Sequence, residues 1–343
     1  MFNFLIWILL IELAILVLFI IMSLFENIYL TSKKKKEEIQ RKILTELFIE
    51  CLEKKVLPIK VLSKSFKNPY LLLTVLEAFN LRFQGGYWIL LKEALSTHFL
   101  LPLARKKYVS RSWSHRYHAA SCFALCPLLG DLPFILPLMK DPLFLVHSAA
   151  SLAAIRLEAF EGLSLMIEKI SLAEDPYSKF FYKDLLLNGS TQVFQCIEKE
   201  ALKETDERTH LTCMDILAAK VFPVAKELLQ RDLASLNPKI RRAALKVYAH
   251  NPQKDSESVL LKAIHSSESE IREEAAFGLS LFSSEASLMA LKKGLSDGCL
   301  AVRLQAAKSL KKNGVKGIAI LNEQKDLKDP IAYEMANYVL EFS

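Results

Sequence analysis

The feature that most constrains the fold is a short motif that returns every 31 residues in the C-terminal half of the chain. The motif consists of an aliphatic residue, an arginine and, shortly after, a pair of alanines. Its clearest copies start at positions 240, 271 and 302 and are Ile240-Arg241-Arg242-Ala243-Ala244, Ile271-Arg272-Glu273-Glu274-Ala275-Ala276 and Val302-Arg303-Leu304-Gln305-Ala306-Ala307. A constant interval of this kind is typical of structural units stacked in a row, so the motif predicts a solenoid.

A second apolar position recurs at the same interval and indicates that each unit holds two helices. Its copies are Ile135, Met166, Ile197, Leu228, Val259 and Ala290. Val259 begins the apolar face of one predicted helix, which continues with Leu260, Ala263 and Ile264. The motif that follows supplies the apolar face of the next helix, Ile271, Ala275, Leu279 and Phe282. Ser266 to Ser269 lie between the two and favour a turn and a helix N-cap. With only 10 glycines and 12 prolines, the chain is predicted to be all-α.

The N-terminus carries an apolar run from Phe4 to Phe25 that only Glu12 interrupts. At about 1.5 Å per residue, this run is long enough to cross a hydrocarbon core of about 30 Å. No cation precedes it and no small-residue cleavage site follows, which argues against a signal peptide. We therefore predict a single transmembrane helix. Glu12 is either simply tolerated within the span or contacts a polar group on a partner membrane protein.

Four lysines, Lys33, Lys34, Lys35 and Lys36, follow the apolar run closely. Since cations accumulate on the cytoplasmic side of a span, they predict an outside N-terminus and a cytoplasmic solenoid. They either contact anionic headgroups or serve only as a stop-transfer flank. The abundance of lysine over arginine is typical of AT-rich bacterial genomes, so we expect a bacterial inner membrane. The predicted domains are an anchor over 1–30, a basic helical linker over 31–65 and a solenoid over 66–343, with its clearest repeats over 206–343.

The repeated pattern resembles a known family. The sequence aliphatic-Arg-x-x-Ala-Ala-x-x-Leu, preceded by Asn237-Pro238, Asp297-Gly298 or Asp329-Pro330, is similar to the short HEAT-like repeat. The resemblance implies a right-handed superhelix of helix pairs whose concave face holds a protein partner. It also implies that Arg241, Arg272 and Arg303 pair with nearby acids and do not form a phosphate-binding ladder. Tyr182 departs from the pattern, because it stands where a small residue is expected.

A stretch rich in cations and aromatic residues is the best candidate for a binding site. It contains Arg105, Lys106, Lys107, Arg111, Trp113, Arg116 and Tyr117. Such a composition suits phosphates, anionic headgroups, an acidic protein surface or nucleic acid. The alternative is a solvated loop between repeats, with Trp113 and Tyr117 partly in the core.

Residues for catalysis or metal binding are harder to find. His115, His118, Cys122 and Cys126 are all ligand types, but on one helix they spread over roughly 16 Å, too far for one tetrahedral ion. The six cysteines are scattered and are expected to be buried free thiols in a reducing compartment. No nucleotide-binding loop, zinc-protease motif or nucleophile elbow is present in the sequence.

These observations favour a membrane-anchored scaffold that recruits a protein, with no enzymatic activity, no cofactor and no metal. Two alternatives stay open at this point. One is a membrane-tethered protein that binds nucleic acid or phosphate through the basic and aromatic stretch. The other is a HEAT-like lyase that acts on a chromophore or another small substrate.

Overall fold

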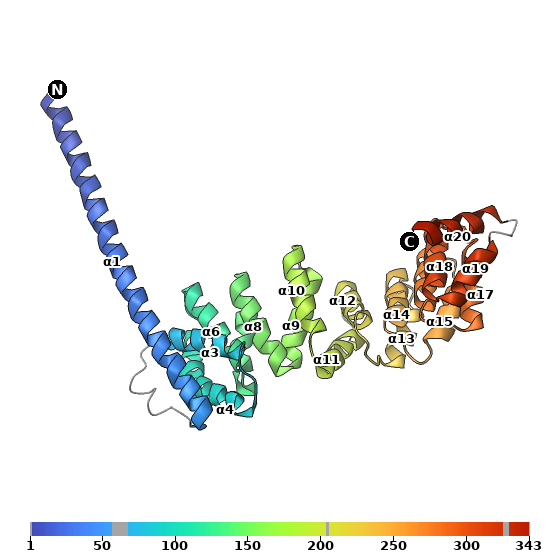
Figure 1. Ribbon diagram of the computed structural model, residues 1–343, viewed down its shortest axis with the longest axis horizontal. Helices are drawn as coiled ribbons and strands as arrows, with labels where there is room; N and C mark the ends of the chain where they lie inside the picture. The colour runs from blue at the N-terminus through green and yellow to red at the C-terminus, as the bar shows by residue number, and fades with distance from the viewer. Residues whose placement is uncertain (1, 57–67, 204–205, 325–328, 343) are drawn as a thin grey trace. The chain divides into compact units, whose positions relative to one another are not determined.

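The computed structural model describes residues 2–56, 68–203, 206–324 and 329–342, with side chains from Ile15 onward. Regular structure within these ranges is helical throughout, and they contain no strand (Figure 1). The predicted all-α class is therefore confirmed. The chain divides into two compact units, residues 1–153 and 154–343, which are described separately.

The first unit begins with α1 (Phe2–Lys54), a continuous helix of 53 residues. From Ile15 to Leu30, every side chain of α1 is exposed. Farther along, Leu44, Phe48 and Cys51 are buried where α1 packs against α3 (Pro69–Asn80). The predicted boundary at residue 30 thus falls inside one helix, which contains neither glycine nor proline.

The rest of the first unit is a stack of short helices. These are α4 (Gly86–Leu95), the π-helical turn η1 (Ser96–Leu100), α5 (Leu101–Lys107), α6 (Trp113–Leu125), η2 (Leu129–Asp131), α7 (Leu132–Met139) and α8 (Phe144–Leu157), which crosses the unit boundary. Helix α6 packs against α3, α5 and α7 and brings Phe123, which is fully buried, into the core.

The second unit contains the helix pairs that the 31-residue interval predicts. Its helices are α9 (Phe160–Leu172), α10 (Pro176–Leu187), α11 (Thr191–Leu202), α12 (Glu207–Ala218), α13 (Lys226–Leu233), α14 (Pro238–His250), α15 (Ser256–Ala263), α16 (Ser269–Leu279), α17 (Glu285–Gly294), α18 (Leu300–Lys312), α19 (Val315–Glu323) and α20 (Pro330–Phe342). Helices α12, α14, α16, α18 and α20 pack on one another in chain order and form one layer. Helices α13, α15, α17 and α19 lie beside them and form the second layer.

Small residues allow the helices of the first layer to lie close together. Ala244, Ala275 and Ala306 occupy the same position of successive motifs, and each is fully buried. Gly278 is a stricter case, because a Cβ atom there would lie 2.8 Å from the Ala249 Cα atom. The larger Tyr182 is also buried, within the uninterrupted helix α10.

Candidate partner-binding surfaces

The N-terminal part of α1 presents an apolar surface, and a basic surface follows it along the helix. Exposed apolar side chains continue from Ile15 to Phe25, where Phe25 is 76% exposed. Lys33, Lys34, Lys35 and Lys36 follow; all four are exposed, and none forms an ion pair with a described residue. The side chain of Glu12, a candidate contact to a membrane partner, lies outside the described residues.

In the basic and aromatic stretch, two of the five cations are engaged inside the fold. The Arg105 Nε atom donates to the Asp131 Oδ1 atom over 2.7 Å, and the Asp131 side chain is fully buried. Arg116 holds Asp141 through two contacts, of 2.5 Å from Nε to Oδ2 and 3.3 Å from Nη2 to Oδ1. Both guanidinium groups therefore join neighbouring segments of the first unit and are occupied in the free protein.

The other residues of the predicted set remain available on the surface. Lys106 and Arg111 are exposed, Lys107 is half-buried, and no described acid pairs with any of the three. Trp113 is 51% exposed at the start of α6, and Tyr117 one turn later is half-buried. The predicted set therefore contains two kinds of cation, those that pair with a distant acid and those that are solvated. The sequence alone does not distinguish them.

The histidines and cysteines of α6 lie in packing contacts. The His118 ring centroid lies 4.3 Å from that of Tyr70, and burial, followed by the charge of His115, lowers the pKa of His118. Burial also raises the pKa of the Cys122 thiol to about 12, with a smaller effect of Glu77, so that this group stays protonated at neutral pH. Across the described part of the chain, no three metal-binding side chains come together.

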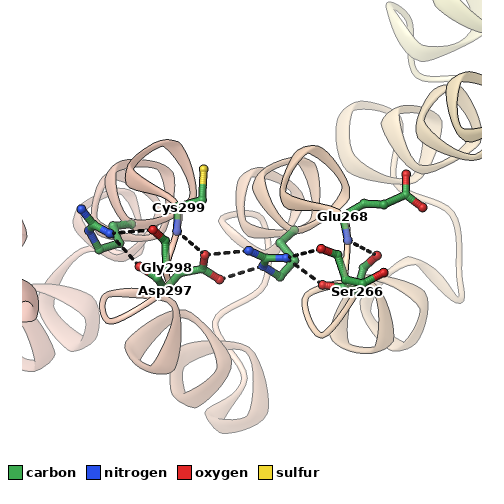
Figure 2. Close-up of polar contacts among 8 residues, drawn as sticks. Ser266, Glu268, Asp297, Gly298 and Cys299 are labelled. Atoms are coloured by element: carbon green, nitrogen blue, oxygen red, sulfur yellow. Dashed lines mark hydrogen bonds and ion pairs between the residues drawn. The ribbon is translucent and has the colours of Figure 1, made fainter.

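Two of the three motif arginines of the second unit, Arg241 and Arg272, connect successive repeats. Arg272 donates from Nη1 to the carbonyl oxygens of Ser266 and Ser267 over 2.9 and 3.0 Å, and from Nε and Nη2 to both oxygens of Asp297 over 2.8 Å each. Asp297 also accepts the amide N–H of Cys299 over 2.8 Å, in the loop just before α18 (Figure 2). The pairing of these arginines with acids, which the resemblance implied, is confirmed for Arg272 and for Arg241, which pairs with Glu268. It is wrong for Arg303 within the described residues, because Arg303 donates only to the carbonyl oxygens of Asp297 and Gly298.

Charged residues on the exposed face of the first layer neutralise one another between helices. Asp215 on α12 receives Lys183 from α10 and Lys246 from α14. Burial opposes ionisation of Asp215, but the hydrogen bonds from the two lysines hold its pKa below the ordinary value. In the same way Lys239 pairs with Glu207 over 3.1 Å and Arg242 with Glu270 over 2.6 Å. This face therefore offers little net charge to an external anion.

A cavity of about 520 Å³ opens in the second unit between α13 and α15. Its apolar lining includes Leu245 and Tyr248 from α14, Val259 from α15 and Ile271 from α16. Its polar lining is Gln230, Arg241, Lys262, Ser266 and Glu268. Helix α15 packs on α17 and α17 packs on α19, but α13 and α15 do not pack together to the same extent, which leaves the space open.

Comparison with protein families identifies the repeats around this cavity. The family model described as HEAT repeats matches residues 224–311, which run from the segment before α13 to α18. Residues 224–311 are HEAT repeats. The HEAT repeats include Arg241, Arg272 and Arg303 and the cavity between α13 and α15. No curated protein matches the chain in sequence.

Several solved structures resemble the chain in fold. An engineered protein shares 15% identity and a TM-score of 0.33, covering 82% of this chain and 87% of its own. Kap121p shares 13% identity and a TM-score of 0.39, covering 83% of this chain and 42% of its own. The CpcE and CpcF complex of phycocyanin lyase from Nostoc sp. PCC7120 shares 17% identity and a TM-score of 0.30, covering 71% and 94%. These similarities concern the fold and not the ligands or reactions of the three proteins.

Proposed function

We propose that the protein is a non-catalytic scaffold, anchored in a bacterial inner membrane by α1, that holds a protein partner on its cytoplasmic HEAT repeats. The observation that carries the proposal is the stretch from Ile15 to Leu30, where every side chain of a long helix is exposed. In water, so much exposed apolar surface on a monomer would be unfavourable, whereas a bilayer would cover it. Among the described residues, α1 has the length and composition of a membrane span.

The repeats support the second part of the proposal. Stacked helix pairs create long surfaces that bind other macromolecules. Polar groups of the second unit connect one repeat to the next, as Arg272 and Asp297 do. Such an arrangement suits a binding role.

Membrane attachment is tested by alkaline extraction of membranes from cells that express the full chain. We expect the wild type to stay in the membrane pellet, and a variant with Leu16→Arg and Phe19→Arg to become soluble. The matched control carries Ile39→Arg and Ile43→Arg, which are exposed on α1 beyond the apolar run, and should stay in the pellet. Extraction of the wild type by alkali would contradict the anchor.

Partner recruitment and orientation are tested on the same membranes. Protease added to intact spheroplasts should leave the repeats uncut, because they face the cytoplasm. Purification of the full chain in mild detergent should recover a protein in stoichiometric amount. A preparation that contains the chain alone would contradict the scaffold role and leave the anchor intact.

A second candidate function, binding of nucleic acid, is favoured by one observation. Lys106, Lys107 and Arg111 are unpaired among the described residues and lie near the half-exposed ring of Trp113 in the chain. Phosphate contacts and base stacking use these two kinds of group. Binding of a single-stranded RNA to the full chain should then weaken steeply with salt and be lost on Lys106→Glu with Arg111→Glu. Binding that is absent at low salt would exclude this function.

A further inference from the structure

The arginine connections between repeats are not all alike, and one of them is incomplete at the cavity between α13 and α15. Arg116 and Arg272 each hold an aspartate through Nε and Nη2. Arg241 reaches its acid, Glu268, through Nη2 alone. Its Nε–H has no acceptor among the described residues, so this arginine keeps an unused donor at the cavity that it lines.

A change in sequence accounts for the difference. Ser266 stands one 31-residue interval before Asp297 and so occupies the place of the missing aspartate. Glu268 replaces it from two positions farther along the same loop (Figure 2). The Arg241 and Glu268 side chains remain 28% and 37% exposed, against 18% and 14% for Arg272 and Asp297. The pair at the cavity is therefore in contact with solvent.

The charge around the cavity favours one anionic group. The charges of Arg241 and Glu268 offset each other, and Lys262 on α15 is exposed and pairs with no acid in the described ranges. The cavity therefore carries one uncompensated positive charge. Below the polar groups lies the partly exposed apolar surface of Leu233, Val259 and Ala263, with the buried side chains of Leu245 and Tyr248 as its floor.

The cavity is also large enough and open enough for part of a protein. Its volume of about 520 Å³ lies within the range of roughly 300–1,000 Å³ typical of binding pockets. It opens between two helices, with the exposed residues Gln230 and Lys262 on either side. Leu236, whose carbonyl oxygen accepts a hydrogen bond from Arg241, is 97% exposed and adds apolar surface beside the cavity. A bound group can thus remain attached to a larger body outside.

We infer that this cavity is the anchor site for the protein partner and binds a short peptide segment in which a large apolar side chain stands next to an aspartate or glutamate. The apolar side chain fills the space over Leu245 and Tyr248, and the carboxylate accepts hydrogen bonds from Arg241 and Lys262. A single buried side chain of this kind commonly supplies much of the affinity of an interface. The inference rests on the proposed function, since it describes how the scaffold holds its partner.

The test uses the full chain in lipid nanodiscs and a phage library of random short peptides. We expect the selected peptides to share a bulky apolar residue within two positions of an acid. By fluorescence anisotropy, Ala234→Trp, which fills the cavity from its lining, should weaken binding of a selected peptide about tenfold or more, and Lys262→Glu by a similar factor.

Matched controls come from the next repeat. Lys293 stands one interval after Lys262 on α17, and Ala286 is an exposed alanine on the same helix. Lys293→Glu and Ala286→Trp should leave affinity within about twofold. Equal losses in the controls, selected peptides that are basic, or a cavity that binds decanoate but no peptide would each overturn the inference. If a partner co-purifies equally well with Ala234→Trp, the anchor site is wrong and the scaffold function stands.

Discussion

The connection between Arg272 and Asp297 allows a quantitative prediction. Replacing Asp297 with alanine removes a bidentate ion pair whose side chains are only 18% and 14% exposed. Breaking a buried pair typically costs about 3–5 kcal/mol, but Arg272 keeps two carbonyl acceptors and some contact with water, so we expect about 2 kcal/mol from this loss. The hydrogen bond from the Cys299 amide adds about 1 kcal/mol. The expected total is about 3 kcal/mol.

Hydrogen exchange measured by mass spectrometry on the full chain is a suitable assay, because it reports the opening of one region and does not require the whole chain to unfold at once. A loss of about 3 kcal/mol corresponds to exchange about a hundredfold faster in the slow amides of α16 and α18. Asp297→Asn keeps an acceptor for the Cys299 amide, so its exchange rate should lie between those of the wild type and Asp297→Ala. Glu270→Ala breaks the exposed pair with Arg242 and should change the opening free energy by about 0.5 kcal/mol or less.

Acid provides a second check on the same pair. The hydrogen bond from Arg272 is the main cause that holds the pKa of Asp297 below its ordinary value of 3.8. Its contribution to stability is therefore complete above pH 3.8 and is lost as pH falls through the folded-state pKa. The difference in opening free energy between wild type and Asp297→Ala should be constant near neutral pH and shrink in acid.

If Asp297→Ala and Glu270→Ala had equal effects on hydrogen exchange at neutral pH, the reasoning about the Arg272–Asp297 pair would be refuted.

Three further substitutions test the packing. Asn251→Leu removes three hydrogen bonds to the main chain at Leu217 and Phe222 and should destabilise the second unit by about 2–3 kcal/mol, seen as faster proteolysis between α12 and α13; unchanged cleavage would contradict this. Gly278→Val forces side-chain atoms against α14 and should cost about 2 kcal/mol or more in thermal unfolding, whereas Gly298→Ala, with nothing within 4 Å of the new Cβ atom, should be neutral. Phe48→Ala should cost about 3 kcal/mol and loosen α1 from α3, measured as faster hydrogen exchange in α3; protection equal to wild type would show that the two helices are held by other contacts.

Much of the second unit was predictable because its structure repeats. A constant interval fixes which residues occupy equivalent places, so the buried Ala244 and Ala275 could be recognised before their contacts were known. The resemblance to the HEAT-like repeat implied that Arg272 would pair with an acid, and the acid is Asp297, 25 positions later. Periodicity carries this information because each repeat contacts mainly its neighbours.

The first unit was harder to predict because its contacts follow no interval. Nothing near Arg105 in the sequence shows that its partner is the buried Asp131, 26 positions away. The continuity of α1 had a sequence signal, the lack of glycine and proline. The cavity between α13 and α15 also left a trace, since Ser266 replaces the aspartate that the interval predicts. That signal becomes meaningful only once the role of Asp297 is known.

The unbroken course of α1 has a mechanical consequence for a protein held in a bilayer. A spanning helix responds to a thinner membrane by tilting, and a helix without glycine or proline transmits that tilt along its length. Leu44, where packing on α3 begins, lies about 28 Å beyond Phe25 along the helix axis, so a tilt change of about 10° would carry it roughly 5 Å sideways. If α1 spans a membrane as proposed, the thickness of that membrane would change the direction in which the first helices face.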